Sequence, residues 1–146
     1  AGTLSDLTNE GVPLQYAIIT VALDTGTGAE LWRDEFDEGR PRRTFWPFLP
    51  AIAVSPGAVY VTATRSIEVV VPFVTAQYED EYNTVALDAR TGDERWVGRW
   101  GEGRSRTAGI TVTPDGKRVF VAGETLELTE RNAGSWDLVT VAYNTD

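Results

Sequence analysis

An internal repeat constrains this chain more than any other feature of its sequence. Residues 20–32 read TVALDTGTGAELW and residues 84–96 read TVALDARTGDERW, an ungapped match at an offset of 64 residues. A third copy begins at Thr140 as TVAYNTD and reaches Asp146 before any Thr-Gly pair or Trp. Self-similarity at a fixed period is typical of repeat architectures, in which each unit buries its apolar face against the next unit.

A second repeated element lies between these copies. AVSPGAVYVTA spans residues 53–63 and TVTPDGKRVFVAG spans residues 111–123, and both place β-branched and aromatic residues around a Pro/Gly turn. Each element therefore predicts a β-hairpin. The TVALD-type copies predict further strands at Tyr16–Asp24, Tyr82–Asp88 and Asp137–Tyr143.

The first two TVALD copies pass through a tight turn into a strand that carries a Trp. Asp24 and Asp88 suit the start of these turns, because a short carboxylate accepts hydrogen bonds from the backbone N–H groups just ahead of it. Gly28 and Gly92 can adopt the positive φ that closes each turn. No segment shows an apolar period of about 3.6 residues over ten or more residues, so almost no helix is expected.

The repeat predicts an all-β fold, a fragment of a β-propeller with about two and a quarter four-stranded antiparallel blades. A β-sandwich is the competing class, but it does not require the same turn and Trp in successive units. Residues 1–36 would hold an N-terminal tail and the last two strands of a first blade, residues 37–100 a complete second blade, and residues 101–146 three strands of a truncated third blade.

These nine predicted strands are too few to close a propeller, which needs at least about four blades. We therefore expect the chain to be part of a larger propeller. The open edges would lie at Tyr16–Asp24 and Asp137–Tyr143, where another protein chain or the remainder of the parent would continue the sheet.

The repeated positions resemble the tryptophan-docking motif of quinoprotein-type (PQQ-like) β-propellers, A-x-[DN]-x-x-T-G-x-x-x-W. The alternation of this motif with the Pro/Gly hairpin is similar to that of secreted bacterial β-propeller repeat proteins. The resemblance implies an extracellular or cell-surface location and a structural role, in which the Trp of an outer strand docks on the neighbouring blade near its Gly. The matching residues are Ala22, Asp24, Thr27, Gly28, Trp32, Ala86, Asp88, Thr91, Gly92 and Trp96.

The composition excludes several kinds of chemistry. The chain has no Cys and no His, which excludes thiol nucleophiles, Ser-His-Asp triads and most zinc sites. It also lacks the vicinal Cys pair of many quinoprotein dehydrogenases, so their activity is not carried over, and no redox cofactor is expected. A net charge of −9 with a single Lys argues against a nucleic-acid partner. No segment approaches the roughly 20 apolar residues that a membrane span requires, so no membrane insertion is expected.

The connections between the predicted strands alternate between tight turns and longer loops. The longer ones span Arg33–Pro50, Thr64–Glu81, Val97–Ala108 and Gly123–Ser135, and in a meander they would emerge on one face. Loops held by a rigid scaffold are where binding residues concentrate, so this face is the predicted site.

Two loop clusters could bind a ligand. A basic and aromatic cluster could grip a carbohydrate or an anionic polymer, or its aromatic residues could anchor the loop while its arginines pair with nearby acids. An acidic cluster could ligate calcium, but it lacks the spacing of a dedicated calcium loop, and a solvated acidic loop is the favoured interpretation. Glu79, Asp80 and Glu81 form a similar acidic group. The first cluster is Arg40, Arg42, Arg43, Phe45, Trp46 and Phe48; the second is Asp34, Glu35, Asp37 and Glu38.

Three functions remain open from the sequence. The first is a non-catalytic extracellular scaffold or interaction module that presents its long loops to a protein or polysaccharide partner. The second is part of a quinoprotein-like oxidoreductase or another propeller enzyme whose catalytic residues lie outside this chain. The third is a lectin-like carbohydrate binder. No residue of this chain is predicted to be catalytic.

Overall fold

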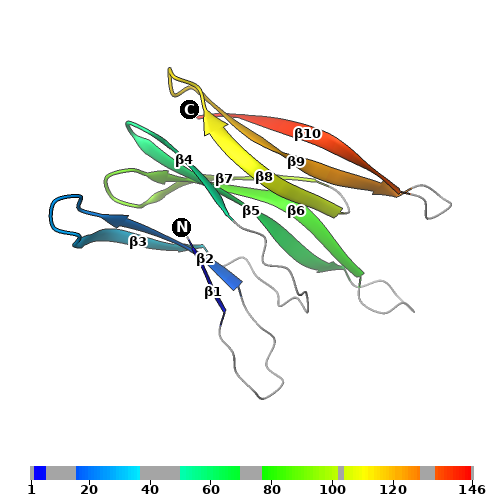
Figure 1. Cartoon of the computed structure of the whole chain (residues 1–146), viewed down its shortest axis with the longest axis horizontal. Helices are drawn as coiled ribbons and strands as arrows, with labels where there is room; N and C mark the ends of the chain where they lie inside the picture. The colour runs from blue at the N-terminus through cyan, green and yellow to red at the C-terminus, as the bar shows by residue number, and fades with distance from the viewer. Residues whose placement is uncertain are drawn as a thin grey trace, which may run out of the picture.

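The computed structural model describes residues 2–5, 16–36, 50–69, 77–101, 104–128 and 134–145, which form ten β-strands and no helix (Figure 1). The predicted all-β class is therefore confirmed for these residues. The strands are β1 (Gly2–Ser5), β2 (Tyr16–Leu23), β3 (Glu30–Phe36), β4 (Ala51–Ser55), β5 (Ala58–Val69), β6 (Gln77–Asp88), β7 (Glu94–Trp100), β8 (Arg104–Val112), β9 (Arg118–Leu128) and β10 (Gly134–Asn144).

The strands pair almost entirely with their neighbours in sequence. We call β1–β3 the first sheet, β4–β7 the second meander and β8–β10 the third meander, and within each of them all pairs are antiparallel. A single parallel pair, Asp80 with Arg104, joins the two meanders into one mixed seven-stranded sheet. The two predicted hairpins are confirmed as β4–β5 and β8–β9.

Regular structure extends further than the sequence predicts. β5 continues to Val69 and β6 begins at Gln77, so most of the predicted connection Thr64–Glu81 is strand. Polar side chains that face each other across the hairpin support this extension: Arg65 lies opposite Glu81, with 2.8 Å between Nη1 and Oε1. The predicted connections Val97–Ala108 and Gly123–Ser135 are likewise shortened by β7, β8, β9 and β10.

The first sheet corrects the predicted open edge at Tyr16–Asp24. β1 pairs with the first half of β2, with Gly2 opposite Ile19 and Ser5 opposite Tyr16. The sheet therefore ends on β1 along this stretch, and the count of nine strands was one too low. The four residues of β1 are too few to show an alternating pattern in the sequence. At the other end, β10 pairs only with β9 among the described strands.

The sheets stack face to face (Figure 1). The two core clusters lie between them. Successive residues of a strand point to opposite faces, so β5 contributes to two interfaces. Val59 and Val61 join the cluster that packs against the first sheet. Tyr60 faces the other way and joins the cluster that contains Val119 and Val121 of the third meander. Each sheet is thus buried by its neighbours in the stack.

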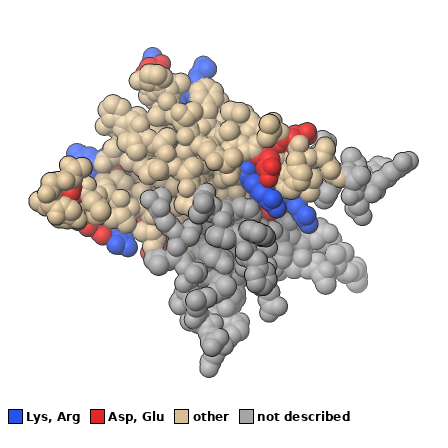
Figure 2. Space-filling model, viewed as in Figure 1, with Lys and Arg blue, Asp and Glu red and all other residues tan. Residues whose placement is uncertain are grey.

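The tight turns lie at one end of the stack of described strands (Figure 1). The β2–β3, β4–β5, β6–β7 and β8–β9 turns all point to one end, whereas the strands meet the undescribed segments at the other end (Figure 1). Figure 2 shows uncharged side chains over most of the described part of the face in view, with charged side chains mainly toward its margins.

Leu87 and Leu23 test this stacking, because they occupy the same position in the two repeats. Leu87 is 0% exposed and Leu23 is 55% exposed. We expect Leu87→Ala to lower the free energy of unfolding by about 2–5 kcal/mol, as for other buried leucines. Leu23→Ala should change it by about 0.5 kcal/mol or less. Urea denaturation measures both, and equal losses would contradict the burial of Leu87 beneath the first sheet.

Candidate functional site

The turn between β2 and β3 is organised by Asp24. Its Oδ1 accepts hydrogen bonds from the backbone N of Gly26 at 3.1 Å and of Thr27 at 2.8 Å, and from Thr27 Oγ1 at 2.7 Å. The Thr27 hydroxyl and then the backbone bonds hold the pKa of Asp24 below its ordinary value. Gly28 closes the turn with a φ of 72° and donates its N–H to the Asp24 carbonyl at 2.8 Å.

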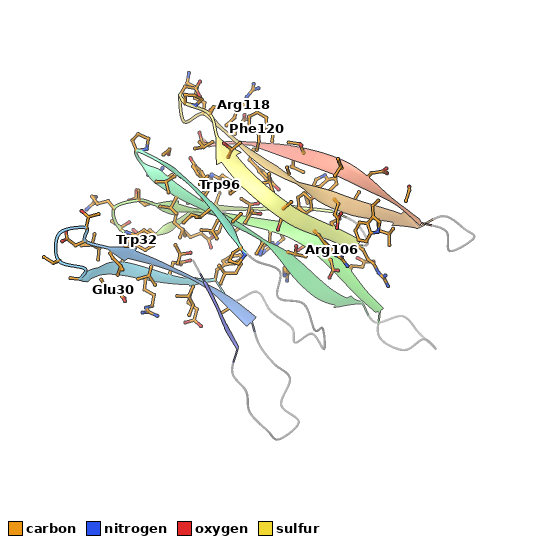
Figure 3. All side chains as sticks on the ribbon, viewed as in Figure 1. Glu30, Trp32, Trp96, Arg106, Arg118 and Phe120 are labelled. Carbon is orange, nitrogen blue, oxygen red and sulfur yellow. The ribbon has the colours of Figure 1, made fainter. Side chains whose placement is uncertain are left out.

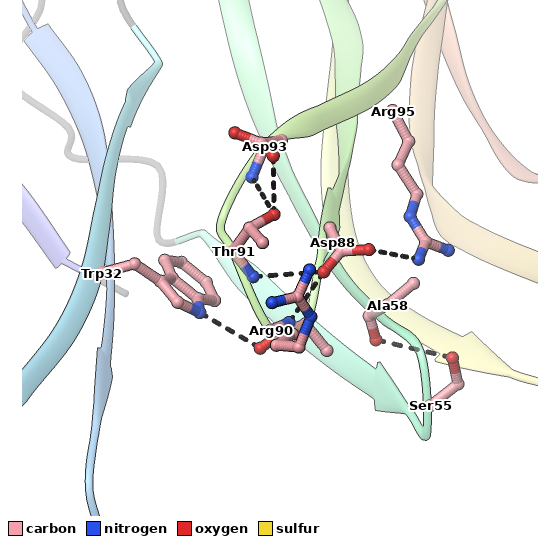
Figure 4. Close-up of polar contacts among 9 residues, drawn as sticks. Trp32, Ser55, Ala58, Asp88, Arg90, Thr91, Asp93 and Arg95 are labelled. Carbon is pink, nitrogen blue, oxygen red and sulfur yellow. Dashed lines mark hydrogen bonds and ion pairs between the residues drawn. The ribbon is translucent and has the colours of Figure 1, made fainter.

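The turn between β6 and β7 repeats this arrangement with one addition. Asp88 Oδ1 accepts from the backbone N of Arg90 at 2.9 Å and of Thr91 at 3.1 Å (Figure 4). The Asp88 carbonyl accepts from Gly92 N at 2.9 Å. Arg95 adds a bond to Asp88 Oδ2 at 2.7 Å, and this guanidinium is the main reason that the pKa of Asp88 lies well below its usual range. The turn is thus held by its own side chains.

Trp32 of the first sheet binds this second turn. Its Nε1 donates to the Ala89 carbonyl at 3.1 Å, as the close-up shows (Figure 4). Gly92 has a φ of 80°, and a Cβ atom on it would lie 2.7 Å from Trp32 Cε3. The indole therefore lies directly over Gly92. We call Trp32 and the turn 88–93 the docking site; it links the first sheet to the second meander.

Trp96 has the same register but different surroundings. It lies opposite Ala86 as Trp32 lies opposite Ala22, and a bulge follows in both strands. Its ring centroid lies 6.0 Å from that of Tyr60 and 5.6 Å from that of Tyr143. Its Nε1 is buried and has no hydrogen-bond partner among the described residues. Both Trp side chains are half-buried.

Gly98, two residues after Trp96, makes a second close approach between layers. A Cβ atom on Gly98 would lie 2.5 Å from Cε1 of Tyr143 in β10. The Tyr143 ring therefore covers the backbone of β7. The corresponding residue in the first sheet is Asp34, a carboxylate.

Asp34 of β3 is an ionisable group with a perturbed pKa on the side of the first sheet that faces the second meander. It lies opposite Thr20 on β2, and its Oδ2 is buried without a hydrogen-bond partner among the described residues. Burial, and then the charge of Glu94, raise the pKa of Asp34 above its ordinary value of 3.8. The sequence suggested only that this residue belonged to an acidic loop cluster.

The structure separates the members of that acidic cluster. Asp34 and Glu35 pair with Thr20 and Ile19, so their side chains leave β3 on opposite faces and are not aimed at one ion. Asp37 and Glu38 lie outside the described residues. Within the described ranges, no group of three or more Asp and Glu side chains is placed to hold a metal ion.

Of the two other predicted clusters, the structure describes the acidic group at residues 79–81 but not the basic and aromatic cluster. Glu81 is bound by Arg65 at 2.8 Å and lies 3.9 Å from Arg99, while Asp80 is buried and Glu79 is exposed. The candidate partner-binding residues all lie outside the described part of the chain: Arg40, Arg42, Arg43, Phe45, Trp46 and Phe48.

A surface that the sequence did not single out lies on the third meander. Arg106 of β8 is placed over the ring of Trp136, with 4.7 Å between Cζ and the ring centroid. Leu138 is 92% exposed, and Phe120 of β9 is half-buried (Figure 3 labels Arg106 and Phe120). Extending the repeat alignment back from Thr140 could have found this surface, because Leu138 then corresponds to Tyr82.

Comparison with known proteins adds no family. No protein-family model matches the chain, and the comparison with curated protein sequences found no match. Among the residues described here, no helix is long and apolar enough to cross a membrane.

Gly92 and Gly28 make a matched test of the docking site. Both have positive φ, so an Ala at either position carries about 1–2 kcal/mol of backbone strain. Only the Cβ at residue 92 meets Trp32, whereas a Cβ at residue 28 meets no described atom within 4 Å. We expect Gly92→Ala to be the more destabilising by a further amount of about 1–3 kcal/mol, typical of overpacking.

A double-mutant cycle with Trp32→Ala identifies the cause of that difference. Once the indole is removed, Gly92→Ala and Gly28→Ala should destabilise the chain equally in urea denaturation. A difference that persists in the Trp32→Ala background would show that the indole does not cause it.

Because the pKa of Asp34 is raised, we expect Asp34→Asn to increase the stability of the folded state by an amount that depends on pH. The folded state holds the Asp34 proton more tightly than the unfolded state does, so the wild type loses stability as the pH rises from 3.8 through the folded pKa. The variant should therefore be more stable than the wild type at neutral pH, and this gain should vanish below the unfolded value. Glu35→Gln, on the exposed face of the same strand, is the control, and thermal unfolding across pH is the measurement. A gain that stays constant with pH would contradict the assignment.

Proposed function

We propose that the chain is a segment of a β-propeller and acts as a non-catalytic extracellular scaffold or interaction module. In this proposal the first sheet, the second meander and the third meander are parts of three successive blades. The observation that carries it is the docking site, where Trp32 of one sheet bonds to Ala89 and covers Gly92 of the next. A Trp in this place matches what the resemblance to quinoprotein-type propellers implies.

The arrangement of the turns supports a scaffold role. Tight turns held by Asp24 and Asp88 occupy one end of the stack, and the strand ends that lead to longer segments occupy the other end (Figure 1). A stack of strands whose ends lead into longer segments on one side suits the display of binding residues. The segment 37–49, which follows Phe36, carries the basic and aromatic residues proposed to contact the partner.

The sheet edges supply a second contact. β10 has a described neighbour on one side only, and β1 forms the outer edge of the first sheet. Backbone N–H and C=O groups at such edges pair readily with a strand from elsewhere. We propose that these edges are continued by another protein chain or by the remainder of a parent propeller.

Binding to an immobilised panel of acidic and neutral polysaccharides tests the loop. The expected result is binding to an acidic polysaccharide that falls at least about tenfold, or about 1.4 kcal/mol, in a triple Arg40→Ser, Arg42→Ser, Arg43→Ser variant. Trp46→Ala should weaken it as well. A control that removes the same charge from exposed described positions, Arg33→Ser with Arg90→Ser and Arg118→Ser, should retain binding.

The same assay separates the alternative functions. Recovery of the polysaccharide at its original length supports a non-catalytic module, whereas shortened or oxidised product would support an enzyme. Binding confined to neutral glycans would favour the lectin-like alternative. Equal binding by the loop variants and the wild type would contradict the assignment of the partner contact to residues 40–48.

A further inference from the structure

The outer face of the third meander is an apolar surface that no described residue covers. Its side chains alternate with those that pack on the second meander, and the cross-strand register places Ala122 opposite Thr140 and Phe120 opposite Ala142. Leu138 is 92% exposed and Trp136 is 43% exposed. We call this the tail face, made by Phe120, Ala122, Trp136, Leu138, Thr140 and Ala142.

The corresponding positions of the second meander are buried. When the TVAYN and TVALD copies are aligned, Leu138 corresponds to Tyr82, Thr140 to Thr84 and Ala142 to Ala86. These three second-meander residues are each 0% exposed, and Tyr82 and Ala86 belong to the core cluster that includes Val119 and Val121 of the third meander. The tail face therefore has the chemistry that this fold elsewhere covers with a sheet of β-branched side chains.

The opposite end of the chain presents the matching surface. The outer face of the first sheet carries Val21 and Leu23 on β2, and Leu23 is 55% exposed. Their counterparts on β6 are Val85 and Leu87, which are 1% and 0% exposed and lie in the core cluster shared with the first sheet. We call the exposed side of β2 and β3 the head face. Among the described residues, the inner layers thus make the kind of contact that the head face and the tail face lack.

The charges on the two faces are complementary. The head face carries Glu30 and Glu35 against Arg33, which is 2.9 Å from Glu30. On the same side of β8 and β9 as the tail face lie Arg104, Arg106 and Arg118, against one acid, Glu124, which is 3.7 Å from Arg106. Acidic side chains outnumber basic ones on the head face, and basic side chains outnumber acidic ones on the side of the tail face. This charge difference favours contact of a head face with a tail face over contact between two like faces.

We propose that copies of this chain associate head to tail, with the outer face of β2 and β3 of one copy stacked on the outer face of β8–β10 of the next. The two surfaces differ, so the contact is heterologous, and each copy retains one free head or tail face for further association. This interaction goes beyond the proposed function and does not depend on a loop ligand.

Two single variants and their mixture test the proposal by sedimentation velocity and light scattering. Leu23→Lys places a charge on the head face, and Leu138→Lys places one on the tail face. The wild type should increase in mass with concentration, and each variant should associate at least about tenfold more weakly. Thr25→Lys, an exposed turn position outside both faces, is the charge-matched control and should behave as the wild type.

The mixture gives the decisive result. Leu23→Lys keeps an intact tail face and Leu138→Lys keeps an intact head face, so an equimolar mixture should form a dimer and nothing larger. Unchanged urea midpoints for both variants would establish that they remain folded; if either midpoint falls, Val21→Thr and Ala142→Ser replace the lysine variants. A wild type that stays monomeric, or a mixture that does not dimerise, would overturn the proposal.

Association through the sheet edges is distinguishable from this contact. Edge pairing uses backbone groups, so it should persist in Leu138→Lys alone. Persistent association of that variant would contradict head-to-tail stacking and leave the edge contact of the proposed function in place.

Discussion

Burial of each sheet by its neighbour in the stack is the interaction on which the rest of this structure depends. The two core clusters lie between layers, and the same strand, β5, sends Val59 to one and Tyr60 to the other. A sheet with two apolar faces cannot be stable alone in water, so position within the stack decides which residues are core. Burial of apolar surface does not by itself fix how two layers are aligned. The hydrogen bond from Trp32 to the Ala89 carbonyl does, because it sets where one layer meets the next.

The repeat predicted the elements that depend on local chemistry. The Asp24 and Asp88 turns, the two Pro/Gly hairpins and the TVALD strands need only short-range hydrogen bonding and alternation, and all are present. The sequence did not predict β1, which exists through its pairing with β2, or the extension of β5 and β6, where charged residues pair across the hairpin. Polar residues in a paired strand look like loop residues until their cross-strand partners are known.

The candidate site was also predictable only where it depends on local sequence and not on the neighbouring layer. The motif places Trp32 and Trp96 alike, yet one indole bonds to a neighbouring turn and the other packs between Tyr60 and Tyr143. That difference depends on which layer packs against each Trp, and the sequence around the Trp does not reveal the neighbouring layer. The sequence grouped Asp34 with its acidic neighbours. In the structure its side chain points toward the second meander, and burial raises its pKa.

The close fit of Tyr143 over Gly98 gives the layers a fixed order. In the repeat alignment, Leu87 on β6 is the counterpart of Tyr143 and Asp34 on β3 is the counterpart of Gly98. The first of these residues is smaller than its counterpart and the second is larger. Exchanging the partners would force a phenol ring against a carboxylate in one interface and leave a void beside a glycine in the other, and dense interiors tolerate neither. Layers that share one motif are therefore not interchangeable. The difference in side-chain volume at this one position therefore opposes stacking of the layers in another order.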